Sequence, residues 1–168
     1  MRARASSLGL ALTIACLLLV PPRAAARDVP FEQAQGEIWT GHLEPLSVDV
    51  GDFDGDGKPD ILVGGDASFE DGKVLLFLNN LGDPSFSTTV EIVNNWRPRT
   101  VIGVDIDRDG DLDVAGVRYA SGEVWWWENL NGDGTSWSGA MLDSLYNADD
   151  ICAADFDRNG WVDLAATQ

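Results

Sequence analysis

The feature that most constrains the fold is an internal repeat. Three segments share an apolar run followed by an aspartate-rich loop, and they begin at Ser47, Thr100 and Asp149. Beyond the loops, the stretch from Gly72 aligns without a gap with the stretch from Gly122. A repeated unit of about 50 residues has the size of one supersecondary element that buries its apolar face against copies of itself.

Short runs of β-type residues, separated by clusters of glycine, aspartate and asparagine, fill the first repeat. They cover Ser47–Gly51, Ile61–Gly65, Lys73–Leu78 and Thr88–Val93. Runs of this length with such punctuation predict strands and turns, and no stretch shows a sustained helical period. Four short strands per repeat predict an all-β fold, namely β-propeller blades of four-stranded antiparallel sheet.

The predicted organisation has five parts. They are a signal peptide (1–26), an N-terminal segment (27–45), repeat 1 (46–98), repeat 2 (99–147) and a truncated repeat 3 (148–168). Because propellers typically close with about four to eight blades, two full blades and part of a third predict an incomplete propeller. We therefore expect either further blades in a longer chain or closure by self-association.

The N-terminus has the layout of a secretory signal peptide. Arg2 and Arg4 precede the apolar residues 8–20, and the alanines at 24–26 suit cleavage. The apolar run has 13 residues, fewer than the roughly 20 that span a bilayer, so we expect no transmembrane span. The alternative, a lipoprotein site at Cys16, lacks a well-matched preceding sequence. A secreted, periplasmic or cell-surface location follows.

The net charge of −17, from 28 acidic and 11 basic residues, argues against nucleic acid as a partner. The chain is nevertheless rich in tryptophan, valine and leucine, which disordered segments avoid. An acidic chain that folds is expected to hold cations. Removal of the signal peptide leaves Cys152 as the single cysteine, so a metal and not a disulfide is the expected staple.

The aspartate-rich loops are the predicted metal sites. Each loop has oxygen-bearing side chains at positions 1, 3, 5 and 9 and a glycine at position 6. Ca²⁺ takes about six to eight oxygen ligands, and alternate residues of a curled loop converge on one point, with the main-chain carbonyl of position 7 as a further ligand. The predicted ligands are Asp52, Asp54, Asp56, Lys58 and Asp60; Asp105, Asp107, Asp109, Asp111 and Asp113; and Asp155, Asp157, Asn159, Trp161 and Asp163.

One Ca²⁺ is expected in each loop, with weaker binding in the third because Asn159 removes a charge. Mg²⁺ fits less well because it demands a tight octahedron and retains its waters. Zinc would require histidine or cysteine ligands. An EF-hand loop would end with a glutamate at position 12, where this chain has Val63, Gly116 and Ala166, so we expect β-hairpin sites that are closed at position 9.

These segments resemble the FG-GAP or VCBS-type repeat, which is best known from the propeller of integrin α-subunits and is common in exported bacterial proteins. The resemblance covers about residues 46–168. It rests on the pattern V-x-x-x-D-x-D-x-[DN]-G-x-x-D, which begins at Val48, at Val101 and, with isoleucine first, at Ile151, and on the G-x-V-x-x-x-x-N segments at Gly72 and Gly122. It implies that each loop joins the first two strands of a blade and holds a cation at one rim of the propeller. The low blade count and the bulky Trp161 depart from the family pattern.

The aromatic run, the histidine and the remaining cysteine are separate candidates for functional residues. The run Trp125–Trp127 could stack on sugar rings, but in a strand Trp125 and Trp127 point to one side and Trp126 to the other, and core packing is the favoured interpretation. His42 is expected at a surface or edge, and Cys152 is expected to fill a small apolar space on an inner strand.

The leading functional hypothesis is a non-enzymatic, calcium-stabilised module for binding or adhesion, which recognises an extracellular protein or carbohydrate. This step rests on analogy, because one fold hosts many functions. Two alternatives remain. The repeats could be the non-catalytic part of a larger carbohydrate-active enzyme, such as a polysaccharide lyase or hydrolase, or they could form a purely structural surface spacer.

Overall fold

The computed structural model describes residues 44–66, 72–79, 86 and 88–167. Within these ranges the chain forms β-strands and no helix. The described part therefore contains no helix that could cross a membrane. The strands are β1 (Glu44–Gly51), β2 (Asp60–Asp66), β3 (Lys73–Leu78), β4 (Thr88–Val93), β5 (Pro98–Val104), β6 (Asp113–Arg118), β7 (Glu123–Asn129), β8 (Trp137–Ser144), β9 (Ile151–Ala154) and β10 (Asp163–Ala166).

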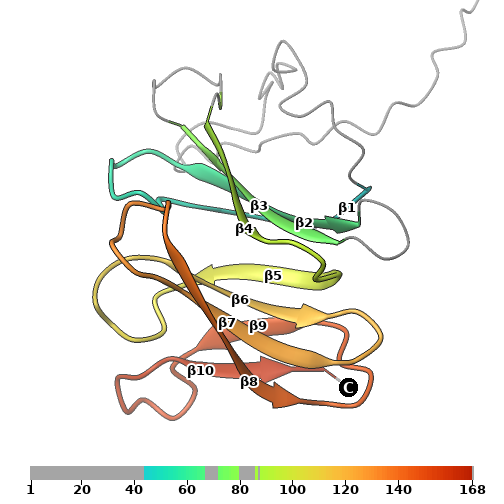
Figure 1. The fold of residues 1–168 in the computed structure, drawn as a ribbon. Coiled ribbons are helices and arrows are strands. Elements are labelled where there is room, and N and C mark those ends of the chain that lie inside the picture. Colours follow the sequence, from blue (N-terminus) through green and yellow to red (C-terminus); the bar gives the residue numbers. More distant parts are fainter. Residues whose placement is uncertain (1–43, 67–71, 80–85, 87, 168) are drawn as a thin grey trace, which may run out of the picture. The chain divides into compact units, whose positions relative to one another are not determined.

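The strands form three antiparallel sheets, ordered β1-β2-β3-β4, β5-β6-β7-β8 and β10-β9 (Figure 1). We call them the first, second and third blade. Two four-stranded sheets and one two-stranded sheet confirm the predicted all-β class, with two full blades and part of a third.

The strand boundaries follow the sequence prediction closely. The third and fourth strands of the first blade coincide with their predicted runs, whereas β1 and β2 are longer at their ends. β1 starts at Glu44, which lies inside the segment 27–45 expected to precede the first repeat. The predicted signal peptide (1–26) and His42 lie outside the described residues.

The main core lies between the first and second blades. Alternate residues of each strand point to the same face of a sheet, and cross-strand partners such as Val114 and Trp127 therefore share a face. The cluster between these two blades consists of Phe53, Leu62, Val74, Leu76, Leu78, Trp96, Val101, Val114 and Trp127. Burial of this apolar surface is the main term that holds the two blades together.

Two of the three consecutive tryptophans belong to this core. Trp127 is buried and meets the edge of Trp96 with ring centroids 4.6 Å apart. Trp125 packs against the same cluster and is stacked on Trp127 at 6.0 Å. The core interpretation of Trp125 and Trp127 is thus confirmed, and both contribute contacts between aromatic rings in addition to burial.

The first strands of neighbouring blades are linked by side chains of β1. Ser47 Oγ accepts a hydrogen bond from the amide of Val101 (3.0 Å) and donates one to the Val101 carbonyl (3.2 Å). Asp49 Oδ2 accepts from the amide of Gly103 (2.8 Å). Side chains of β1 therefore satisfy main-chain groups of β5 that the sheet of the second blade leaves free.

A second link between the blades runs through Phe53, at position 2 of the first loop. Its side chain is fully buried, and its ring lies so close to Gly103 that a Cβ there would be 2.5 Å from Phe53 Cζ. Its carbonyl accepts a hydrogen bond of 2.9 Å from Nδ2 of the buried Asn129. Phe53 thereby anchors the loop of the first blade to the second blade.

The third blade docks on the second through a smaller apolar cluster. Ile151 packs with Ala115, Val117 and Val124. The neighbouring Cys152 is exposed, so the expectation that it fills an apolar space was wrong. In a strand, adjacent side chains face opposite ways, and Ile151 is the one that faces the second blade.

The buried Phe53 offers a matched test of this packing. We expect Phe53→Ala to lower the free energy of unfolding by about 3–5 kcal/mol, as for other large-to-small core changes. The matched control is Phe156→Ala, at the same loop position of the third repeat, because Phe156 is 58% exposed; its expected change is below about 0.5 kcal/mol. Urea denaturation measures both, and equal losses would contradict the proposed role of Phe53 between blades.

Candidate metal centre

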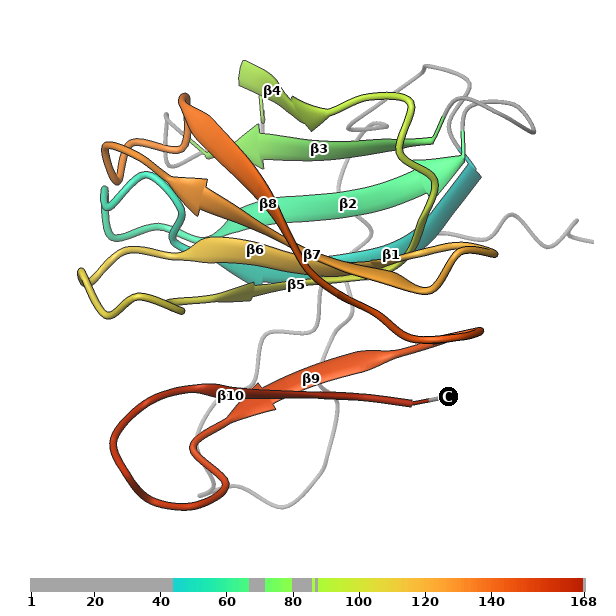
Figure 2. The same cartoon turned by 60° about the horizontal axis from the view of Figure 1, so that its bottom comes forward.

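The three aspartate-rich loops connect β1 to β2, β5 to β6 and β9 to β10, and they lie at the same end of their sheets (Figures 1 and 2). In each loop, three carboxylates offer one oxygen apiece, and these oxygens lie within 4.8 Å of one another. The groups are Asp52, Asp54 and Asp60; Asp105, Asp107 and Asp109; and Asp155, Asp157 and Asp163.

The backbone of each loop curls through two left-handed positions. Position 6 is Gly57, Gly110 or Gly160, with φ of 85°, 102° and 88°, as the predicted sharp turn requires. Position 4 also has positive φ, at 71° for Gly55, 67° for Arg108 and 62° for Arg158. The sequence analysis missed this second position, although the glycine at 55 was a signal for it. Non-glycine residues there carry a conformational cost.

Main-chain amides inside the loops point at the first aspartate. The amide of Gly57 donates to Asp52 Oδ2 (2.9 Å), and that of Gly160 donates to Asp155 Oδ2 (2.8 Å). In the second loop the amide of Arg108 donates to Asp105 Oδ1 (2.7 Å). These bonds wrap each loop around its position-1 carboxylate and direct the following acids to the same side.

The aspartate at position 9 is a structural anchor of the hairpin. The Asp60 side chain is fully buried; its Oδ2 accepts from the amide of Phe53 (2.9 Å) and its Oδ1 from the amide of Asn79 (2.8 Å). Asp113 is equally buried and accepts from Ile106 (3.1 Å) and Asn129 (2.9 Å). Each carboxylate thus ties the loop to the end of the third strand of its blade.

The loops differ in which acids converge. In the first loop, the Asp56 carboxylate forms an ion pair with Lys58 and lies outside the oxygen group. The second loop brings Asp109 into the group in place of Asp113. In the third, Asn159 Nδ2 donates to Asp157 Oδ2 (2.9 Å). The structure therefore brings together nine of the predicted side-chain ligands.

Position 7 was predicted to contribute its main-chain carbonyl, and that role stays a prediction for Lys58, Asp111 and Trp161. The side chains of Asp111 and Trp161 make contacts that differ from each other. The Asp111 carboxylate lies against Gly132, where an added Cβ would be 2.6 Å from Oδ2. The Trp161 ring lies under the Arg108 guanidinium, 5.0 Å from its carbon, which links the second and third loops by a cation–π contact.

The clustered acids raise one another's proton affinity. Burial is the main cause that raises the pKa of Asp54, Asp60 and Asp113 above the usual 3.8, and neighbouring carboxylates add to it. For Asp111, burial followed by repulsion from Asp109 raises the pKa to about 6. A bound cation would reverse this cost, because it favours the charged form of nearby carboxylates.

The oxygen groups have the composition of a site that could hold a metal ion. Three carboxylates in one curled loop supply the hard oxygen ligands that Ca²⁺ takes, and Ca²⁺ accepts a more flexible geometry than Mg²⁺. Moreover, Asp52 Oδ1 is buried and has no hydrogen-bond partner among the described residues. An unpaired carboxylate oxygen of this kind is costly unless a cation satisfies it.

The anchoring and metal-binding roles can be separated by mutation. Without metal, we expect Asp113→Ala to lower the free energy of unfolding by about 3 kcal/mol, because it leaves two main-chain amides without an acceptor. Asp109→Ala, at an exposed member of the oxygen group, should change it by less than about 0.5 kcal/mol without metal but reduce the stabilisation by calcium. Urea denaturation with and without calcium measures both, and similar losses for the two variants without metal would refute the anchoring role.

The raised pKa values predict how the metal-free protein responds to pH. A carboxyl whose pKa is higher in the folded than in the unfolded state binds protons on folding, so stability is lost as pH rises from the unfolded value of 3.8 through about 6. We expect metal-free protein to be more stable at pH 5 than at pH 7.5 in urea denaturation. Calcium should oppose this trend, because its ligands must be deprotonated. Greater metal-free stability at pH 7.5 would contradict the prediction.

Comparison with known proteins agrees with the repeat seen in the strands and loops. The model of the FG-GAP-like repeat family matches residues 52–116 and, a second time, residues 105–166. Searches of curated proteins and of solved structures found no match. The two family matches start at Asp52 and Asp105, the first aspartates of two loops, and together cover more than half of the chain. The chain belongs to the FG-GAP-like repeat family.

Proposed function

We propose that this chain is an exported, calcium-stabilised module that binds a protein or carbohydrate and has no catalytic activity of its own. The observation that carries the proposal is a group of three converging carboxylate oxygens in each of the three loops, from positions 1, 3 and 9 in the first and third loops and from positions 1, 3 and 5 in the second. A solvated acidic turn would require neither the convergence of these oxygens nor amides that wrap the loop around position 1.

Calcium would act as a staple for each hairpin. The loops join the first two strands of their blades, and the oxygen groups combine acids from the start of the loop with the start of the next strand in the first and third blades. Since Cys152 is free, metal ligation is the cross-link that these blades offer. The cation would also offset the repulsion within a chain of net charge −17.

Export is proposed from the sequence of residues 1–26 and from the chemistry of the loops. Calcium sites of extracellular modules work with dissociation constants of about 10⁻⁴ to 10⁻³ M. Loops of this kind would be filled outside a cell without binding tightly. The repeat architecture supports a role in recognition. The proposed calcium ions would fix the hairpins at one end of the blades, so the turns at the opposite end could differ in residue composition without loss of the fold.

Calcium binding predicts a gain in stability by mass action. At a free calcium concentration 100 times the dissociation constant, each filled site adds about 2.7 kcal/mol to the free energy of unfolding. Thermal unfolding should therefore shift upward in calcium and return on chelation, with a smaller effect from Mg²⁺.

The matched control replaces the position-1 aspartates in one variant, Asp52→Asn, Asp105→Asn and Asp155→Asn, which nearly preserves size while removing charge. This variant should lose most of the calcium response. Identical melting of the natural chain in calcium and in chelator would refute the calcium staple.

A further inference from the structure

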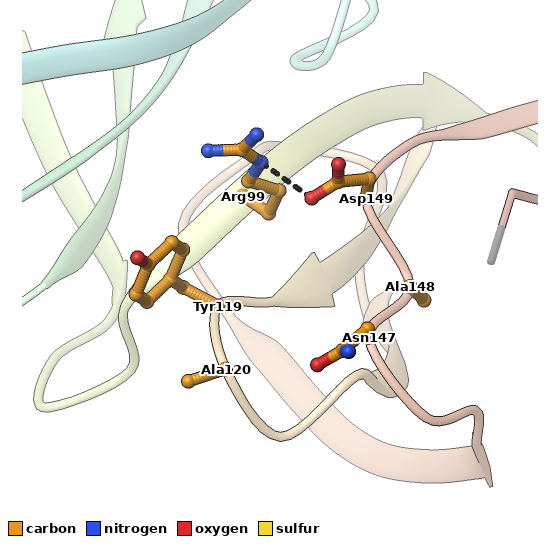
Figure 3. Close-up of a pocket in the computed structure, with 6 residues that line it drawn as sticks. All are labelled: Arg99, Tyr119, Ala120, Asn147, Ala148 and Asp149. Carbon is orange, nitrogen blue, oxygen red and sulfur yellow. Dashed lines mark ion pairs between the residues drawn. The ribbon is translucent and has the colours of Figure 1, made fainter.

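A cavity of about 450 Å³ lies between the second and third blades. It is lined by Arg99, Tyr119, Ala120, Asn147, Ala148 and Asp149 (Figure 3). These residues come from β5, from the turn between β6 and β7, and from the connection between β8 and β9. The turns involved are at the opposite end of the blades from the aspartate-rich loops (Figures 1 and 2), so this site is separate from the candidate metal centre.

Main-chain hydrogen bonds fix the walls of the cavity. The amide of Leu145 donates to the carbonyl of Gly122 (2.9 Å), which ties the β8–β9 connection to the β6–β7 turn. At Gly122 any Cβ would lie 1.6 Å from the Leu145 oxygen. The amide of Asp149 donates to the carbonyl of Thr167 (3.1 Å). The site is therefore largely formed before any ligand arrives, as is usual for small-molecule sites.

The lining offers complementary polar groups beside an aromatic ring. Arg99 Nε lies 2.9 Å from Asp149 Oδ1, and the Arg99 guanidinium carbon lies 5.7 Å from the centroid of the Tyr119 ring. Figure 3 shows Arg99 and Asp149 on one side of the cavity, with Tyr119 and Asn147 around the rest. A guanidinium donates, a carboxylate accepts and an amide does both, which together suit a group of adjacent hydroxyls.

These residues are not required by the repeat itself. In the aligned first repeat, Leu46 stands in place of Arg99 and Asp66 in place of Tyr119, and Arg99 aligns with Asp149 of the third. The Arg99–Asp149 pair is largely exposed, with side-chain exposure of 41% and 65%, and such surface pairs contribute little to stability. A role in ligand binding therefore explains the presence of Arg99, Tyr119 and Asp149 between these two blades better than a contribution to stability does.

We propose that this cavity binds a neutral saccharide, with Tyr119 packing against the sugar ring and Arg99, Asn147 and Asp149 bonding to its hydroxyls. The proposal deepens the binding role given above and rests on it. The guanidinium carbon of Arg97 lies closer to the Tyr119 ring centroid, at 4.1 Å, than that of Arg99, at 5.7 Å, so cation–π contacts hold the ring in place without a ligand.

The surrounding charge favours a neutral ligand over an acidic one. The nearby cations are each paired with an acid: Arg97 with Asp66, Arg99 with Asp149 and Arg118 with Glu123. Asp150, which follows the lining residue Asp149 in the chain, adds a further negative charge. With a chain charge of −17, long-range electrostatics would repel a polyanion, whereas a neutral sugar needs only the local hydrogen bonds.

The test is isothermal titration of the full chain, in calcium, with neutral hexaoses of glucose, galactose, mannose and xylose, and with polygalacturonate. We expect at least one neutral hexaose to bind. Arg99→Ala and Tyr119→Ala should each weaken that binding at least tenfold, whereas Tyr119→Phe should retain it because the ring is preserved. Lys73→Ala removes an exposed ion pair with Glu91 in the first blade and serves as the matched control with unchanged affinity. Melting temperatures check that each variant is folded.

The proposal is overturned if none of the neutral hexaoses binds, if polygalacturonate alone binds, or if Arg99→Ala and Tyr119→Ala bind like the natural chain. Calcium-dependent melting without saccharide binding would remove this site and leave the calcium-stabilised module intact. Saccharide binding that is lost in Tyr119→Ala, with no effect of calcium on melting, would retain the site and remove the calcium staple.

Discussion

The structure depends on a buried carboxylate at position 9 of each full blade's loop. Asp60 and Asp113 each accept hydrogen bonds from two main-chain amides that lie far apart in sequence, one in the loop and one at or just after the end of the third strand. A two-stranded hairpin is barely stable alone, and this carboxylate joins it to a third strand. Because the bonds are charge-assisted and sheltered from water, they are stronger than ordinary turn bonds.

The clustered carboxylates of the loops have two opposing electrostatic effects on stability. Gathering carboxylates orders the hairpin through their bonds to amides, but it also places like charges together in a partly buried site. Beside the second group, burial and then repulsion from Asp109 raise the pKa of Asp111 to about 6. A bound divalent cation, as proposed above, would offset this repulsion, and folding and metal binding would then be coupled in one equilibrium. Such coupling would make the local calcium concentration a determinant of how much of the chain is folded.

Local patterns in the sequence predicted the local structure well. The strands, the left-handed glycines at position 6 and the shared face of Trp125 and Trp127 follow from short-range stereochemistry, and they were predictable. The outward orientation of Cys152 and the pairing of Asp56 with Lys58 were not, because they depend on which face packs and on competition between neighbouring side chains. The cavity at Arg99 and Tyr119 was not predictable either, since only folding brings its three chain segments together.

Finally, the contact between Phe53 and Gly103 makes the order of the repeats matter. The aligned residues in the other two repeats are Val50 and Ala153, and any side chain at this place would meet the Phe53 ring at 2.5 Å. Although the repeats look interchangeable in sequence, the blade that follows Phe53 must present a glycine. The missing side chain at Gly103 therefore selects which blade can pack against Phe53. It would disfavour a shuffled order of otherwise similar blades during folding.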